Sequence, residues 1–188
     1  KAVGGRAHEN GRYVFMDGTR LSNAGASANL TLKEMTEDCG VDILTFGGTK
    51  NGLMIGEAVI ALRPELEKNL QFYRKQTTQL YSKMRYISSQ FIPYMNENIW
   101  LENAQKSNSA AQLLAKKMNE FECIELTQKV ESNIILFTIP KEISDKMQEH
   151  YFFYNTNEAT NEMRLVCSWD TTKEDINAFI SHLNTLTS

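Results

Sequence analysis

The sequence of 188 residues has few cysteines and few histidines. Its three cysteines lie far apart and none is in a CxxC pair, which indicates a reducing compartment rather than a disulfide framework. Its three histidines are just as isolated, so the spacing needed for a zinc site is absent. We therefore expect a cytoplasmic protein that binds no metal ion.

Long hydrophobic runs and an excess of positive charge are also missing. No segment is apolar enough to span a bilayer, and the first residues contain no secretory hydrophobic region. The 20 lysines and arginines are scattered among 23 aspartates and glutamates, which gives a net charge of −3 rather than a basic face for nucleic acid. We therefore expect neither a membrane nor a nucleic-acid partner.

The first half of the sequence contains alternating strand and helix patterns. Strands are predicted over residues 12–17, 41–46 and 56–62, with a helix over residues 30–40. Thr31 and Glu34 have the spacing of a capping box, and Gly40 has the position of a residue that ends a helix. The strand at 41–46 shows little alternation, which predicts burial on both faces. A strand, a helix and a second strand with short connections predict a βαβ unit.

The second half continues with helix patterns and then a second set of alternating elements. Helices are predicted over 64–84 and 98–121, with Pro93 marking a kink or break. Strands are then expected at 123–127, 132–140, 151–155 and 162–169, and helices at 141–150 and 171–186. The chain is predicted to be α/β throughout. Only about three core strands precede the helical section, and a doubly wound sheet normally needs more. We therefore expect this chain to be the C-terminal part of a larger protein.

A lysine and an aspartate stand where predicted strands end. Lys50 follows the strand 41–46 and the pair Gly47–Gly48, and Asp17 ends the strand 12–17. Ligands of α/β sheets bind beyond the carboxyl ends of parallel strands, so both side chains are expected at one edge. A partly desolvated lysine could act as an amine nucleophile, and a carboxylate could keep a ring nitrogen protonated. A solvated turn lysine and a simple Asp-Gly turn are the alternative interpretations.

Together, the stretches FMDGTRLSNA and VDILTFGGTKNGLMIGEAVIAL resemble the threonine aldolase/β-eliminating lyase family of fold-type-I pyridoxal-phosphate (PLP) enzymes. The resemblance implies that Lys50 forms the Schiff base with the cofactor and that Asp17 pairs with its pyridine nitrogen. It also implies that Arg20 lies beside the cofactor hydroxyl and the substrate carboxylate, and that Thr49 contacts the phosphate. Thr19 stands where the family motif has alanine. The implied fold is the C-terminal portion of a fold-type-I PLP-dependent transferase-like protein, with residues 1–97 in the large PLP-binding domain and 98–188 forming a small α/β domain.

Arg164 is a third candidate, in the predicted strand EMRLVCSW. It alternates with Met163 and Leu165, so it lies on the opposite face from them, where a solvent-facing arginine is the alternative interpretation. The resemblance implies that Arg164 grips the substrate α-carboxylate, for which a planar guanidinium is well suited. Lys83 and Arg85 fall in the segment whose basic residues, in the family, reach a neighbouring subunit's cofactor; a solvated helix surface explains them as well.

The resemblance implies cleavage of the Cα–Cβ bond of a β-hydroxy-amino acid, from L-threonine or L-allo-threonine to glycine and acetaldehyde. A homodimer or homotetramer is expected, because sites in this fold lie between subunits. Another PLP reaction, namely β-elimination, racemisation or transamination, stays open because Asp17, Lys50 and Arg164 would serve all of them. An inactive fragment without the N-terminal phosphate-binding half also stays open, as does a generic α/β binding domain with coincidental motifs.

Overall fold

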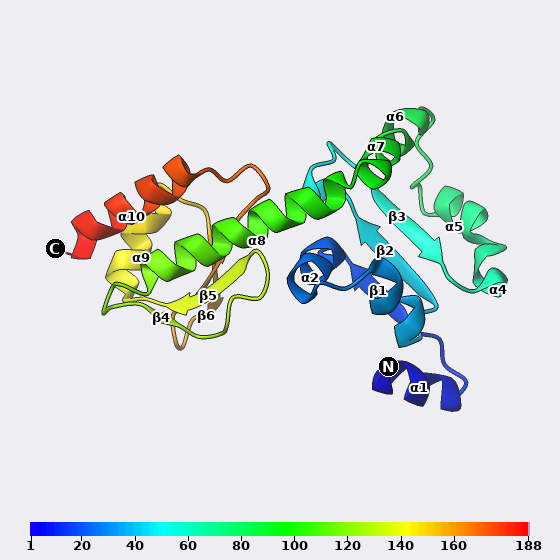
Figure 1. Ribbon diagram of the computed structural model, residues 1–188, viewed down its shortest axis with the longest axis horizontal. Helices are drawn as coiled ribbons and strands as arrows, with labels where there is room; N and C mark the ends of the chain where they lie inside the picture. The colour runs from blue at the N-terminus through cyan, green and yellow to red at the C-terminus, as the bar shows by residue number, and fades with distance from the viewer. Residues whose placement is uncertain (188) are drawn as a thin grey trace. The chain divides into compact units, whose positions relative to one another are not determined.

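The structure, a computed structural model, describes residues 1–187. The chain divides into two compact units, Lys1–Glu102 and Asn103–Ser188. The long helix α8, Ile99–Met118, contains the boundary between them (Figure 1). Within the described residues, no helix is both long enough and apolar enough to cross a bilayer.

The first unit is built on a three-stranded sheet with the order β1-β2-β3 (Figure 1). The strands are β1 (Phe15–Gly18), β2 (Ile43–Gly47) and β3 (Glu57–Ala61). β1 and β2 are parallel, and β3 runs antiparallel to β2. The connection from β1 to β2 contains α2 (Leu21–Ala28), α3 (Leu32–Met35) and the 3₁₀ turn η1 (Glu37–Cys39). The predicted βαβ unit is confirmed, whereas α2 was not predicted.

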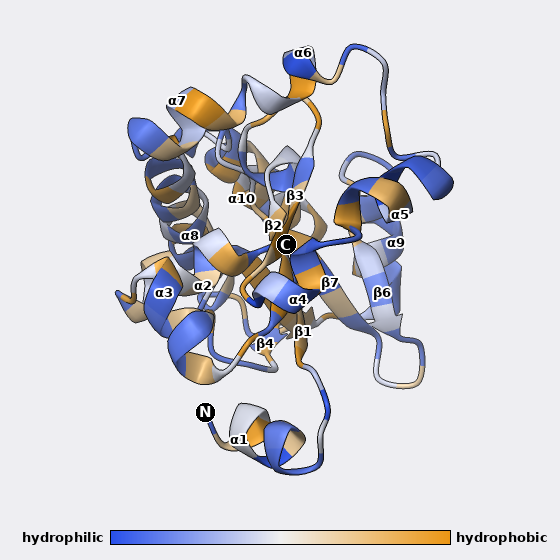
Figure 2. Cartoon of the chain, turned by 90° about the vertical axis from the view of Figure 1, so that its right-hand side faces the viewer, coloured by the Kyte–Doolittle hydropathy of each residue, from blue (hydrophilic) through white to orange (hydrophobic). Residues whose placement is uncertain are grey.

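The register divides this sheet into two faces with different surroundings. Asp17, Thr45 and Val59 pair across the strands and share one face, and Leu44 and Phe46 lie on the other. Leu44 and Phe46 on the second face are buried, because α2, α7 (Phe91–Asn96) and the start of α8 pack against them. Val59 is exposed and Thr45 is half-buried, so the predicted burial of β2 on both faces is wrong for this chain. Figure 2 shows the hydrophobic residues concentrated in these strands.

The capping box predicted after residue 30 is present, but the helix is shorter than predicted. Thr31 Oγ1 accepts a hydrogen bond from the Glu34 N–H, and the Glu34 carboxylate accepts one from the Thr31 N–H at 2.8 Å. The helix is interrupted at Thr36, whose hydroxyl donates to the Leu32 carbonyl at 2.7 Å, a bond that competes with the helix ladder. Gly40 ends η1 with a φ of 80°, as its position predicted.

The helix predicted over 64–84 is wrong in its extent. Pro64 starts α4 (Pro64–Glu67) as predicted, and α5 (Leu70–Gln76) follows, but no regular element continues to residue 84. Thr78 has a φ of 60°, which a helix does not accommodate. A break does precede Pro93, between α6 (Arg85–Ser88) and α7, and Pro93 lies in the first turn of α7, where its missing N–H is not needed. A second break lies at Asn98, with a φ of 57°, between α7 and α8.

Helix α1 (Ala2–Glu9) is joined to the start of β2 by a buried carboxylate. Asp42 is 1% exposed and accepts hydrogen bonds from His8 Nε2 at 2.8 Å, the Val14 N–H at 2.7 Å and Arg63 Nε at 2.8 Å. Burial by itself raises the pKa of Asp42, but these three donors outweigh burial and hold the pKa at about 2. Asp42 therefore stays ionised, and it joins α1, the start of β1 and the end of β3.

The second unit is a four-stranded antiparallel sheet packed with α8, α9 and α10. The sheet order is β4-β5-β7-β6, with β4 (Glu125–Leu126), β5 (Ile134–Thr138), β6 (Tyr154–Asn157) and β7 (Glu162–Val166). α9 (Lys141–Gln148) and α10 (Lys173–Thr187) match their predicted positions. The strand predicted at 151–155 begins instead at Tyr154, because Tyr151 packs against Phe179 of α10 with ring centroids 4.9 Å apart. β7 ends at Val166, before the predicted end at Trp169.

Candidate active site

Lys50 lies in a short turn between β2 and β3, the 3₁₀ turn η2 (Thr49–Asn51). Gly47 brings the end of β2 close to the residues that follow β1, and Gly48 packs against Leu53 and Gly56 within the turn. A Cβ atom added to Gly47 would lie 2.2 Å from the carbonyl oxygen of Thr19, so only glycine allows this approach. The end of β2 therefore lies directly against the residues that follow Asp17.

Asp17 is held as a carboxylate at this edge. Its Oδ1 accepts hydrogen bonds from the Thr19 hydroxyl at 2.6 Å, the Thr19 N–H at 3.1 Å and the Thr45 hydroxyl at 3.4 Å. The bonds from Thr19, then that from Thr45 and the positive charge of Lys50, lower the pKa of Asp17 below its ordinary 3.8. All three hydrogen bonds reach one oxygen. Oδ2 accepts none from residues 1–187 and is available to a further donor.

The Lys50 amine lies near this carboxylate and is otherwise unengaged. β1 and β2 are parallel and Lys50 follows the end of β2, so both residues belong to the same edge of the sheet. The positive charge of Lys50 makes a small contribution to the lowered pKa of Asp17. The side chain is exposed, and its Nζ forms no hydrogen bond or ion pair with any residue in the described range. A free amine beside an ionised carboxylate, at the carboxyl ends of two parallel strands, suits an electrophilic ligand with a basic ring.

Thr49 and Arg20 flank this pair. The Thr49 hydroxyl accepts from the Gly56 N–H at 2.9 Å and donates to the Gly56 carbonyl at 3.3 Å, so it closes the turn. The Thr49 N–H also donates to the Glu57 carboxylate at 3.3 Å. Arg20 is half-buried and immediately precedes α2, three residues after Asp17.

Two buried residues that the sequence does not assign to the site, Asn51 in the turn and Tyr94 of α7, support this turn. Asn51 is 3% exposed and its Nδ2 donates to Tyr94 Oη at 2.6 Å and to the Trp100 carbonyl at 2.8 Å. Tyr94 is 1% exposed and its hydroxyl donates to the Gly47 carbonyl at 3.4 Å. An asparagine beside glycines is typical of an exposed turn, so the sequence carries no signal of its burial.

Arg164 belongs to the second unit, in the middle of its sheet. It pairs with Leu136 of β5 on one side and Tyr154 of β6 on the other, on the face opposite the buried Met163, as the alternation predicted. Its guanidinium carbon lies 5.1 Å from the centre of the Tyr154 ring. Its Nε is buried and has no acceptor among the described residues, which favours binding of an added acceptor such as a carboxylate.

Lys83 and Arg85 are both exposed. Lys83 lies in the irregular segment before α6, and the guanidinium of Arg85 lies 5.0 Å from the ring centre of Tyr86. Neither contacts Asp17 or Lys50 through a hydrogen bond or ion pair within the described range.

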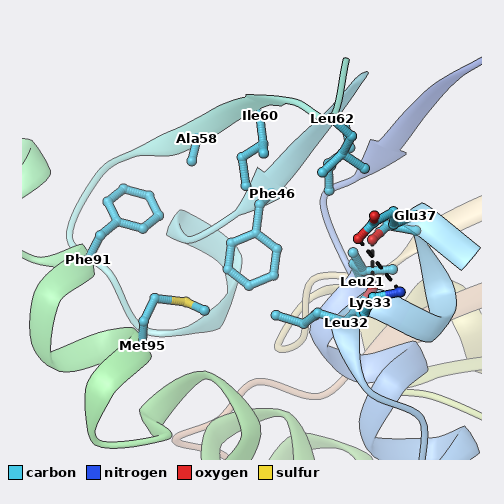
Figure 3. Close-up of a pocket in the computed structure, with 12 residues that line it drawn as sticks. Leu21, Leu32, Lys33, Glu37, Phe46, Ala58, Ile60, Leu62, Phe91 and Met95 are labelled. Carbon is cyan, nitrogen blue, oxygen red and sulfur yellow. Dashed lines mark hydrogen bonds and ion pairs between the residues drawn. The ribbon is translucent and has the colours of Figure 1, made fainter. Parts of the chain in front are cut away.

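A cavity of about 330 Å³ lies in the first unit, but on the other face of the sheet. Its lining includes Phe46 and Ile60 from the strands and Phe91 and Met95 from α7, which point toward one another in Figure 3. The register puts Leu44 and Ile60 on the face opposite Asp17 and Thr45. This apolar cavity is therefore separate from the polar edge that carries Asp17 and Lys50.

A parallel strand pair with an aspartate and a lysine at its carboxyl end, an antiparallel third strand and a small α/β unit together define the class: the fold of type I PLP enzymes. The sequence matches the family model for β-eliminating lyases over residues 1–140. The chain belongs to the β-eliminating lyase family. PLP is the cofactor of this family, as the sequence analysis expected.

Two curated relatives of this chain come from Pseudomonas. The chain is 34% identical over 171 residues to a low specificity L-threonine aldolase from Pseudomonas sp. (strain NCIMB 10558) and covers 49% of it, with 91% of this chain aligned. It is 32% identical to the corresponding protein from Pseudomonas aeruginosa, with 94% of this chain and 51% of that protein covered. The chain therefore spans about half the length of these relatives.

A solved structure shows the same fold. The threonine aldolase from Leishmania major is 28% identical, with a TM-score of 0.87 over 99% of this chain and 55% of that chain. The predicted fold class, the C-terminal portion of a fold-type-I PLP enzyme, is confirmed by this match and by the family.

The residues at the sheet edge fit this cofactor. Asp17 is ionised and keeps one oxygen available, which suits a protonated ring nitrogen. Lys50 has an amine without a hydrogen-bonding partner in the described part of the chain, which suits an aldehyde. Gly47 and Gly48 have no side chains, which allows the backbone to pack closely against Thr19 and Gly56 beside these two residues.

Proposed function

We propose that this protein is a PLP-dependent lyase that cleaves the Cα–Cβ bond of a β-hydroxy-amino acid, converting L-threonine or L-allo-threonine to glycine and acetaldehyde. The observation that carries the proposal is the place of Asp17 and Lys50 in the topology: Asp17, whose pKa is lowered, lies near the carboxyl end of β1, and Lys50 follows the carboxyl end of the parallel β2. The substrate class is supported by two curated relatives, both low specificity L-threonine aldolases, at 34% and 32% identity.

Each residue has a distinct role in this proposal. Lys50 supplies the amine that holds the cofactor aldehyde. Asp17, ionised because of its hydrogen bonds from Thr19, holds a proton on the ring nitrogen through its available Oδ2. When bound, the cofactor accepts the electron pair that is released at Cα when the bond breaks. Thr49 is assigned to the phosphate, although its hydroxyl already bonds to the Gly56 backbone.

Arg164 is assigned to the substrate carboxylate, together with Arg20. The buried Nε of Arg164 has no acceptor within the described residues, and a carboxylate would supply one. A guanidinium that binds the carboxylate fixes the rotation about the bond between nitrogen and Cα, and so determines which bond of Cα is aligned for cleavage. We further propose that residues 1–97 belong to the large PLP-binding domain and 98–188 to the small domain, and that the active protein is a cytoplasmic homodimer or homotetramer.

Borohydride trapping tests the proposal directly. The full-length protein is incubated with PLP, reduced, digested and mapped by peptide mass. We expect a pyridoxyl group on Lys50 in the wild type, none at this position in Lys50→Ala, and normal labelling of Lys50 in Lys116→Ala, which changes an exposed lysine of α8. A label on another lysine, or no label, would refute the assigned role of Lys50.

Two further measurements separate the roles and the reactions. Asp17→Asn should retain the label on Lys50 but lose about 100-fold or more in kcat, the size typical of removing one preorganised electrostatic partner. Product analysis with L-threonine distinguishes glycine and acetaldehyde, the expected products, from a keto acid and ammonia, which would indicate β-elimination instead.

A further inference from the structure

The turn that carries Lys50 has little hydrogen bonding of its own. η2 spans only Thr49–Asn51. The carbonyl of Gly48, the residue before it, accepts hydrogen bonds from the Asn51 N–H at 3.0 Å and the Leu53 N–H at 3.1 Å. One such turn fixes few dihedral angles by itself. Contacts on both sides of Lys50 therefore decide where its side chain points.

Both neighbours of Lys50 are anchored. On one side, the Thr49 hydroxyl exchanges hydrogen bonds with the backbone of Gly56 at 2.9 and 3.3 Å. On the other side, Asn51 is buried and uses both amide hydrogens, one to Tyr94 Oη and one to the Trp100 carbonyl. Lys50 itself is exposed, so its own side chain adds no anchor.

Tyr94 extends this anchor to the end of β2. Its hydroxyl accepts from Asn51 and donates to the Gly47 carbonyl, so one buried group contacts the chain on both sides of Lys50. Burial raises the pKa of Tyr94, which keeps the hydroxyl protonated and able to donate. The ring is packed between Phe46 and Phe91, with centroid distances of 6.2 and 6.1 Å, so it has little freedom to move.

We propose that Asn51 and Tyr94 are positioning residues for Lys50, which means that they fix where its amine lies. This inference rests on the proposed function. Neither touches the cofactor or substrate in this proposal; they act through the backbone of residues 47–51. A misplacement of about 1 Å at a reacting group can cost about 100-fold in rate, so loss of this anchor should be visible in the chemistry of Lys50.

If the buried amide of Asn51 only stabilised the fold, its loss would not change the reactivity of Lys50 in the folded protein. A matched control distinguishes this structural role from the positioning role. Asn133 is also a buried asparagine, 4% exposed, and its Nδ2 donates to the Cys167 carbonyl at 2.8 Å, but it belongs to the second unit. Removing either amide loses a buried hydrogen bond and lowers stability. Only removal of the Asn51 amide should change the reactivity of Lys50.

The test uses the full-length protein and four forms: wild type, Asn51→Ala, Tyr94→Phe and Asn133→Ala. Tyr94→Phe keeps the ring and its packing, so it remains informative if Asn51→Ala does not fold. The measurements are the folded fraction from urea unfolding, the rate at which PLP is captured on Lys50 before borohydride quenching, and the dependence of that rate on pH. Mapping by peptide mass reports Lys50 without requiring turnover.

We expect capture at Lys50 to slow by about 10- to 100-fold in Asn51→Ala and Tyr94→Phe at equal folded fraction, with an altered pH profile. Asn133→Ala should lose stability but capture PLP at the wild-type rate. Wild-type capture rates in both first-unit variants would overturn the positioning role while leaving the proposed function intact. No capture at Lys50 in the wild type would overturn the proposed function and this inference with it.

Discussion

Replacing Asp42 by asparagine should destabilise the first unit by about 2 kcal/mol, because its buried charge is removed. The pKa of Asp42 falls from its ordinary 3.8 to about 2 in the folded protein. At about 1.4 kcal/mol per pKa unit, this difference corresponds to about 2 kcal/mol of stability. The cost should not reach the roughly 3–5 kcal/mol of a fully buried pair, because His8 and Arg63 are 32% and 48% exposed and can regain water.

The direction of the pH dependence follows from the lowered pKa. The contribution of Asp42 is complete above pH 3.8, the ordinary value, and is lost as the pH falls toward about 2. Wild type and Asp42→Asn should therefore differ in urea unfolding at pH 7 and converge as the pH is lowered from 4. Asp145→Asn is the matched control, since Asp145 pairs with Lys141 at an exposed position and should cost about 0.5 kcal/mol or less.

If Asp42→Asn is no less stable at pH 7 than Asp145→Asn, the buried charge of Asp42 does not stabilise the first unit. A difference from wild type that does not depend on pH would contradict the same role. Because Asp42 lies at the start of β2 and Lys50 beyond its end, the folded fraction of Asp42→Asn should still capture PLP on Lys50 at the wild-type rate.

Two further substitutions and one chemical modification test the packing. Gly47→Ala should cost about 1–3 kcal/mol and reduce capture of PLP at Lys50, because its Cβ would lie 2.2 Å from the Thr19 carbonyl oxygen. Gly5→Ala in α1, where an added Cβ meets no atom within 4 Å, should instead stabilise the protein by about 0.5–1 kcal/mol. Equal effects of the two substitutions on the free energy of unfolding in urea would contradict the close packing of Gly47. Cys167 is 2% exposed and burial raises its pKa to about 11, so iodoacetamide at pH 8 should modify it only after unfolding. Rapid modification of Cys167 in the folded protein, measured by peptide mass, would contradict the burial of its side chain.

Local features were predictable because their partners lie within a few residues. The capping box joins Thr31 to Glu34, and the end of η1 needs only the left-handed φ of Gly40. The strands β1, β2 and β3 follow from their apolar runs and the glycines between them. The roles suggested for Asp17 and Lys50 came from motif spacing, and their shared edge follows from the parallel pairing of β1 and β2.

The errors have tertiary causes. Helix α2 was not predicted because its sequence, LSNAGASA, consists mostly of small residues with no apolar period. In the structure, one side of this helix is buried, at Leu21, Ser22, Asn23 and Gly25. The sequence signal for its end is the residue type of Asn29, because asparagine often ends a helix in the left-handed conformation, as Asn29 does here with a φ of 53°. The pattern over 64–84 is helical in composition, yet the exposed side chains of Phe72, Tyr73 and Tyr81 show that little packing supports a continuous helix there.

The α/β class, the approximate positions of the strands and the motif that contains Asp17 and Lys50 can be predicted from the sequence, because hydrophobic period and turn chemistry act over short distances. Which polar residues are buried depends on the tertiary fold. Asn51 meets Tyr94 across 43 positions and Asp42 meets His8 across 34, and no local pattern carries such a pairing. A buried polar group is stable only where a distant partner completes its hydrogen bonds, so its environment is determined by how the chain folds.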